Sequence, residues 1–146
     1  MDSRIVVGVD GSEESLAALR WALREARLRG ASLEVVHAWH YPYAAYTDIT
    51  GMAAGVVTRE DLAKVGQLVL EESLRAGEAT GGDVPVTPTL VQGTPAEALL
   101  RVAAGADLLV VGSRGRGGFT GLLLGSVSQQ CAHHAPCPLV IIPHTS

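Results

Sequence analysis

Residues 106–115 read Ala-Asp-Leu-Leu-Val-Val-Gly-Ser-Arg-Gly, a short apolar run that passes directly into glycine. Such a run, with branched side chains toward its end, is typical of a strand buried on both faces of a parallel sheet, here over 107–112. More glycines follow, and the stretch 126–133 then contains neither glycine nor proline, so it can form a helix. The glycines that follow residue 115 up to this stretch are Gly117, Gly118, Gly121 and Gly125.

The succession of strand, glycine loop and helix predicts an anion-binding site. Glycine has no Cβ, so the loop can adopt left-handed conformations and its main-chain N–H groups can approach an anion closely. The first-turn N–H groups of a helix have no intrahelical acceptor and carry partial positive charge. We expect Gly115 and Gly125 to offer N–H donors to a phosphate, and Ser126 to offer its hydroxyl and its N–H. The alternative interpretation of the glycines is a surface loop that binds nothing.

Strand patterns alternate with helix patterns along the whole chain. Strands are expected at 4–9, 32–38, 84–91, 107–112 and 139–142. Helices are expected from residue 13 to about 28 after a Ser12 cap, at 58–79, at 95–104 after a Thr94 cap, and from Ser126 onward. Right-handed crossovers between five strands give an α/β fold of the Rossmann-like class, an open parallel sheet with helices on both faces. We expect the strand order 3-2-1-4-5, the commonest arrangement for a binding fold.

This strand order brings the carboxyl ends of strands 4–9 and 107–112 together at a switch point, where ligands bind in open α/β sheets. Gly8, Val9 and Asp10 would then face the glycine loop. Asp10 is the first charged group after an apolar strand, and its carboxylate could accept hydrogen bonds or help to hold a cation such as Mg²⁺. In the alternative interpretation, Asp10 only forms the turn that leads into the helix.

Composition indicates one domain, spanning 1–146, with a sizeable core, because 47% of the 146 residues are hydrophobic. The formal net charge is −4, and the arginines are scattered among glutamates, so the chain lacks the basic surface of a nucleic-acid binder. No apolar run approaches the length of a membrane span, and the N-terminus does not resemble a secretory signal. We therefore expect a cytoplasmic protein without nucleic-acid or membrane partners.

Cys131 and Cys137 flank His133 and His134, a cluster that could bind a metal ion. Adjacent histidines on a helix point about 100° apart, however, which does not suit tetrahedral zinc. The cysteines are better interpreted as two small buried hydrophobic residues.

Residues 39–57 form a long irregular connection, which we interpret as a lid.

Several nucleotide-binding and catalytic motifs are missing from the sequence. There is no P-loop lysine, so only Arg114 and Arg116 could neutralise phosphate charge in the glycine loop. The dinucleotide fingerprint after the first strand and the G-x-S-x-G elbow are also absent. His37 is the only histidine expected near the cleft, and a packing role is favoured over a role as a base. Fast phosphoryl transfer is therefore not expected.

The spacing G-x-x-G, nine residues, G-S from Gly112 to Ser126 resembles the ATP-binding signature of the universal stress protein family. The segments 5–12, 35–38 and 134–143 resemble that family as well. The resemblance implies a five-stranded α/β domain that binds an adenine nucleotide and forms a homodimer. It also implies that Gly8, Val9 and Asp10 line the adenosine end of the pocket, with the Ala38 backbone near the adenine. The candidate nucleotide-binding residues are Gly8, Val9, Asp10, Ala38, Gly112, Arg114, Gly115, Arg116, Gly125, Ser126, Val127 and Ser128.

The final strand, Leu139–Ile142, is apolar without alternation and would lie at a sheet edge. A second copy that pairs antiparallel with this edge would satisfy its free backbone groups.

The favoured function is a dimeric, ATP-binding regulatory protein whose nucleotide state acts as a switch. A slow ATP hydrolase, an AMP- or cyclic AMP-binding protein, and a partner-binding module with a vestigial pocket remain as alternatives.

Overall fold

The computed structural model describes residues 2–40, 58–114 and 124–143, and all structural statements concern these residues. In chain order the elements are β1 (Arg4–Gly8), α1 (Glu13–Arg29), β2 (Ser32–Trp39), α3 (Arg59–Ala76), β3 (Val86–Gln92), α4 (Pro95–Val102), β4 (Leu108–Gly112), α5 (Ser126–His134) and β5 (Leu139–Ile142). The expected lid between β2 and α3 lies almost wholly at 41–57, outside the described residues.

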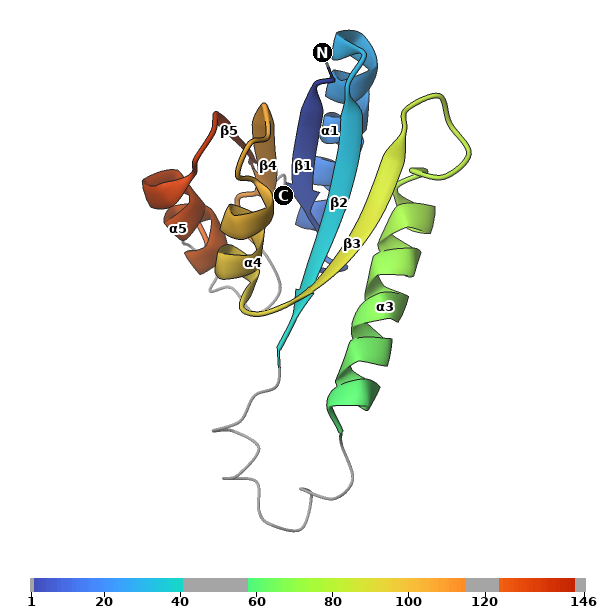
Figure 1. Ribbon diagram of the computed structural model, residues 1–146, viewed down its shortest axis with the longest axis vertical. Helices are drawn as coiled ribbons and strands as arrows, with labels where there is room; N and C mark the ends of the chain where they lie inside the picture. The colour runs from blue at the N-terminus through green and yellow to red at the C-terminus, as the bar shows by residue number, and fades with distance from the viewer. Residues whose placement is uncertain (1, 41–57, 115–123, 144–146) are drawn as a thin grey trace.

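The five strands form one parallel sheet in the order β3-β2-β1-β4-β5, with β1 at its centre and β3 and β5 at its edges (Figure 1). In β1, Val7 is in register with Val35 of β2 on one side and with Val110 of β4 on the other. The apolar runs with branched side chains, from which strands buried on both faces were predicted, therefore occupy the middle of the sheet. The predicted α/β class and strand order are both confirmed.

Two hydrophobic layers cover the two faces of the sheet. On one face, α1 and α3 pack on the strands through side chains such as Leu19 and Leu70, which are 0% and 1% exposed. On the other face, α4 and α5 pack through Leu99 and Cys131. Because alternate residues of a strand point to opposite faces, Val110 belongs to the first layer and Val111 to the second.

The helix ends show which capping predictions hold. Ser12 caps α1 by accepting a hydrogen bond from the Ser15 N–H at 3.2 Å, and Gly30 ends this helix in the left-handed conformation. Thr94 does occupy the N-cap position of α4, but its hydroxyl donates to the Glu97 carboxylate instead of capping a backbone N–H. Thr94 is therefore the N-cap residue of α4, as predicted, but without a side-chain capping hydrogen bond.

Some predicted boundaries also shift, by two or three residues in β3, α3 and α4. The third strand begins at Val86 rather than at residue 84 and runs to Gln92. Helix α3 ends at Ala76 rather than at residue 79, because the chain turns at Gly77 and Glu78, where Glu78 has a φ of 57°. Helix α4 ends at Val102, two residues before the predicted end.

Gly112 lies where α1 crosses the end of β4. A Cβ at this position would lie 3.0 Å from the main-chain carbonyl oxygen of Glu14, closer than side chains normally approach a backbone. Neither Gly112 nor Gly125 adopts the left-handed conformation that the sequence suggested for the loop glycines. Gly112 is thus required by the close packing of helix on strand.

We predict that Gly112→Ala lowers the free energy of unfolding by about 1–3 kcal/mol, because the added methyl group forces α1 away from β4. Gly82→Ala is the matched control, since a Cβ there meets no atom within 4 Å. Its stability should stay within about 0.5 kcal/mol of the wild type. Urea unfolding followed by circular dichroism measures both variants, and equal midpoints for the two would contradict the packing role of Gly112.

Candidate functional site

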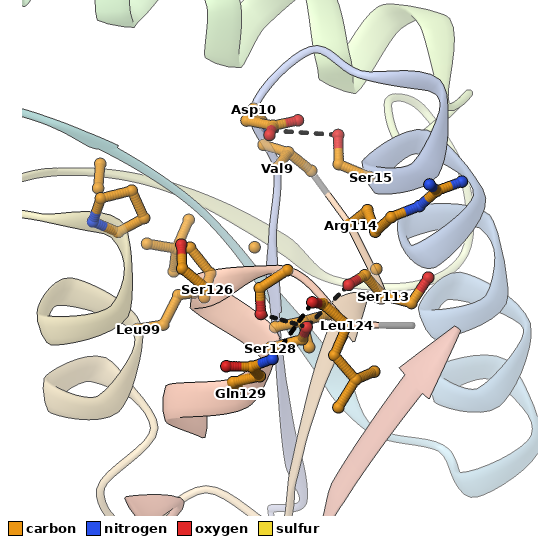
Figure 2. Close-up of a pocket in the computed structure, with 18 of the residues that line it drawn as sticks. Val9, Asp10, Ser15, Leu99, Ser113, Arg114, Leu124, Ser126, Ser128 and Gln129 are labelled. Atoms are coloured by element: carbon orange, nitrogen blue, oxygen red, sulfur yellow. Dashed lines mark hydrogen bonds between the residues drawn. The ribbon is translucent and has the colours of Figure 1, made fainter. Parts of the chain in front are cut away.

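A cleft of about 460 Å³ opens at the carboxyl ends of β1, β2 and β4, next to the start of α5 (Figure 2). Its position is the switch point of the sheet, where the strand order reverses between β1 and β4. The lining residues are Gly8, Val9, Asp10, Ser15, Val36, His37, Ala38, Pro95, Leu99, Val111, Gly112, Ser113, Arg114, Leu124, Gly125, Ser126, Val127, Ser128 and Gln129.

Asp10 lies in the short connection between β1 and α1. Its Oδ1 accepts hydrogen bonds from the Ser12 N–H at 2.9 Å and from the Ser12 hydroxyl at 2.5 Å. Its own N–H donates to the Ser15 hydroxyl at 3.2 Å. Asp10 therefore forms the turn that leads into α1 and lines the cleft at the same time, so the two interpretations of this residue do not exclude each other.

His37 lies at the end of β2, and its Nδ1 is 2.8 Å from the carbonyl oxygen of Val9. A carbonyl oxygen only accepts, so Nδ1 carries the hydrogen of this bond. The contact fastens the end of β2 to the end of β1, next to the main-chain bond from the Val9 N–H to the Val36 carbonyl oxygen at 2.8 Å. His37 thus has the hydrogen-bonded packing role favoured by the sequence, although it also lines the cleft.

The start of α5 is tied to the end of β4. The Gly125 N–H donates to the carbonyl oxygen of Ser113 at 2.6 Å, and the buried Ser128 hydroxyl donates to the same oxygen at 2.8 Å. Figure 2 shows Ser113, Ser128 and Leu124 gathered at this junction. The expectation that Gly125 offers its N–H to a phosphate is therefore wrong, because that N–H already has a protein acceptor.

The next three N–H groups along the chain differ from that of Gly125 in their hydrogen bonding. No described residue accepts a hydrogen bond from the N–H of Ser126, Val127 or Ser128, and the first helical bond of α5 runs from the Gln129 N–H to the Gly125 carbonyl oxygen. All three residues line the cleft. These N–H groups carry the partial positive charge of the helix start, so the cleft suits an anionic ligand at this end.

Part of the cleft wall is apolar. Val36, Leu99 and Val111 contribute buried side chains to it from the hydrophobic layer under α4 and α5. Val9 also lines the cleft, at the end of β1, but packs in the layer on the other face of the sheet. Leu99 reaches across from α4 to Gly8, where a Cβ would lie 2.8 Å from the Leu99 Cδ1 atom. The cleft thus joins an apolar wall to an anion-attracting end, a combination that fits a flat heterocycle with an attached phosphate.

Charged side chains are few among the described lining residues. Asp10 is their one carboxylate and Arg114 their one guanidinium. Arg114 directly follows β4 and is partly buried at the cleft. A metal ion bound together with phosphates would therefore meet Asp10 as its protein carboxylate.

Ten of the twelve candidate residues named from the sequence line this cleft, and the other two, Gly115 and Arg116, lie outside the described residues. The sequence analysis missed Pro95 and Leu99 on α4, and Ser113 between the signature glycines. It also missed Ser15 on α1, as well as Leu124 and Gln129 around the start of α5. Ligands bind at the carboxyl ends of the strands in open α/β sheets, and α4 begins just after the carboxyl end of β3. This rule could have identified Pro95, at the start of α4.

The cysteine and histidine cluster lies on and after α5. Cys131 is fully buried, and burial raises the pKa of its thiol to about 11, so it behaves as a small hydrophobic residue. Cys137 is only partly buried, which makes the prediction of two buried cysteines half right. The described part of the chain contains no group of three His, Cys, Asp or Glu side chains that could hold a metal ion.

The fold and the cleft define a doubly wound α/β protein with a cleft at its switch point. A sequence model of the universal stress protein family matches residues 1–143, and the chain belongs to that family. Within the described residues, no helix is long and apolar enough to cross a membrane.

Two curated relatives show how far the sequence similarity extends. A universal stress protein of Mycobacterium tuberculosis is 39% identical over 137 residues, which are 94% of this chain and 44% of that protein. One of Mycolicibacterium smegmatis is 38% identical over 143 residues, which are 97% of this chain and 46% of that protein. The chain thus spans less than half the length of the curated relatives it matches.

Solved structures share the fold. A universal stress protein solved in complex with cAMP has 29% identity and a TM-score of 0.68, with 99% of this chain and 98% of that chain covered. One from Archaeoglobus fulgidus in complex with dAMP has 26% identity and a TM-score of 0.67, with 96% and 97% covered.

Proposed function

We propose that this chain binds an adenine nucleotide in the cleft between β1, β4 and α5. The observation that carries the proposal is the start of α5, where the N–H groups of three successive lining residues have no acceptor among the described residues. Main-chain donors at a helix start are well suited to a phosphate group. The apolar wall of the cleft gives the heterocyclic base a surface on which to pack.

The similar structures support the choice of an adenine base. Two universal stress proteins of 26–29% identity were solved with cAMP and with dAMP, and both ligands pair an adenine with a phosphate. The cleft of this chain has an apolar wall and an anion-attracting end, which suit these two parts of such a ligand. We assign the adenine to the wall formed by Val36, Leu99 and Val111, with Val9 and the Ala38 backbone at its edge.

The phosphates are assigned to the other end of the cleft. The Ser126 hydroxyl, the first-turn N–H groups of α5 and the Arg114 guanidinium would bind them, together with Gly115 and Arg116 by their place in the signature. Each charge-assisted hydrogen bond contributes roughly 1.5–3 kcal/mol, so three or four of them are enough for micromolar affinity after the cost of association. We favour ATP, with Mg²⁺ held between the phosphates and the Asp10 carboxylate.

We further propose that the protein acts as a stress-response regulator that binds nucleotide without rapid turnover. The glycine loop carries no lysine to stabilise charge on the β- and γ-phosphates, as P-loop enzymes require. His37, the one histidine among the described lining residues, already uses its Nδ1 to bond the Val9 carbonyl oxygen. A slow ATP hydrolase remains the second candidate, because the phosphate end of the cleft would accept ATP.

The fifth strand is proposed to form a homodimer. β5 pairs with β4 on one side and lies at the edge of the sheet (Figure 1). Its four residues, Leu139–Ile142, are all partly exposed and all apolar. An apolar edge without a charged residue needs a cover, and a second copy running antiparallel would supply it.

Nucleotide binding is tested by isothermal calorimetry with ATP and AMP. Gly125→Val places a branched side chain at the start of α5 and should abolish measurable binding. Ser126→Ala removes one donor and should weaken binding by about 1–2 kcal/mol. Gly82→Val, in the connection between α3 and β3 and outside the cleft lining, is the control and should bind like the wild type. Equal affinity in all four proteins would exclude the start of α5 as the phosphate site.

Turnover is tested by phosphate release under saturating ATP and Mg²⁺. We expect a rate far below the ~1–10³ per second of dedicated enzymes. Ser126→Ala serves as the comparison, because it should weaken ATP binding without supplying or removing a base. A wild-type rate within that range, lost in Ser126→Ala, would identify an enzyme and refute the regulatory proposal.

The homodimer is tested by sedimentation at micromolar concentration. The wild type should sediment as a dimer, whereas Val140→Lys and Ile142→Lys should shift it to monomer by placing charge in the interface. Thr87→Lys is the matched control, since Thr87 is an exposed residue of the other edge strand, β3. A monomeric wild type refutes the proposal, and so does a dimer that both β5 variants leave intact.

A further inference from the structure

Ser113 carries a buried hydroxyl that has no hydrogen-bond partner among the described residues. The residue is 3% exposed and lines the cleft directly after β4. Its backbone is fully used, because the N–H donates to the Ile142 carbonyl oxygen at 2.8 Å and the carbonyl oxygen accepts from Gly125 and Ser128. A buried hydroxyl without a partner destabilises a protein by the full cost of its lost hydration. The Ser113 hydroxyl therefore calls for an explanation that its backbone contacts do not give.

The other hydroxyls around the cleft are accounted for by the protein or by water. The Ser12 hydroxyl donates to Asp10, the Ser15 hydroxyl donates to the Ser12 carbonyl oxygen at 3.0 Å, and the Ser128 hydroxyl donates to Ser113. Ser126 is exposed, so water satisfies it. Within the described lining residues, Ser113 is thus the one serine whose hydroxyl is buried and unpartnered.

We propose that the Ser113 hydroxyl donates a hydrogen bond to the phosphate of the bound ligand. Ser113 lines the cleft, its carbonyl oxygen holds the start of α5, and Arg114 follows it, so the residue lies at the anion-attracting end of the cleft. Hydrogen bonds from a hydroxyl to an anionic oxygen are about twice as strong as bonds between neutral groups. The inference rests on the proposed function and adds to it a phosphate donor that lies between the signature glycines.

The experiment compares Ser113→Ala with Ser73→Ala. Ser73 is the matched control because its hydroxyl is the other buried, unpartnered one in the described residues, and it lies in α3 away from the cleft. Both variants remove an unsatisfied hydroxyl, so both should melt a few degrees higher than the ligand-free wild type. Only Ser113→Ala should lose affinity for AMP and ATP, by about tenfold or more in calorimetry, while its affinity for adenosine stays unchanged.

Three results would overturn the inference. Unchanged AMP affinity in Ser113→Ala shows that the hydroxyl does not contact the phosphate, and an equal loss for adenosine shows that it acts elsewhere in the site. A melting temperature below that of the wild type shows that the hydroxyl has a structural partner. Ser113→Cys, which is nearly the same size and a weak donor, repeats the affinity test if Ser113→Ala does not fold. A wild type that binds inorganic pyrophosphate but no adenine compound refutes the proposed function alone, and one that binds neither refutes both.

Discussion

The carbonyl oxygen of Ser113 is the point on which the arrangement of the cleft depends. It accepts hydrogen bonds from Gly125 at 2.6 Å and from the Ser128 hydroxyl at 2.8 Å, which hold the first turn of α5 against the end of β4. The Ser113 N–H meanwhile extends the pairing of β4 with β5 through Ile142. Three elements thus meet at one residue, and the remaining first-turn N–H groups of α5 line the cleft as a consequence.

The sheet order and most of the cleft could be predicted from the sequence because they follow from rules with little freedom. Apolar strands joined by helices give a parallel sheet, and its switch point lies at the carboxyl ends of β1 and β4. The roles of single glycines could not be predicted in this way. Gly8 and Gly112 are needed because Leu99 and Glu14 approach them closely, and these neighbours become visible only once the helices are packed.

Tertiary packing also explains why some residues of the cleft could not be predicted from the sequence. Leu99 belongs to a helix with no recognisable motif, and it reaches the cleft because α4 packs on the face that carries Val36 and Val111. Gly125 has a suitable position and residue type for a phosphate donor, yet its N–H is used by Ser113. Hydrogen-bond satisfaction depends on atoms that are distant in sequence, so a local motif predicts where a ligand site lies better than which donors remain free.

The two ends of the proposed site would recognise different parts of the ligand by different physical interactions. Main-chain N–H groups at a helix start donate hydrogen bonds to negatively charged groups. They discriminate little between a ligand with one phosphate and a ligand with several. The apolar wall of Val36, Leu99 and Val111 would respond to the shape of a planar base, because its contacts depend on close packing. Discrimination between bases would therefore rest on the wall, whereas discrimination between ATP and AMP needs contacts farther along the phosphate chain. Arg114 and Arg116 are the side chains of the glycine loop with the charge for that task.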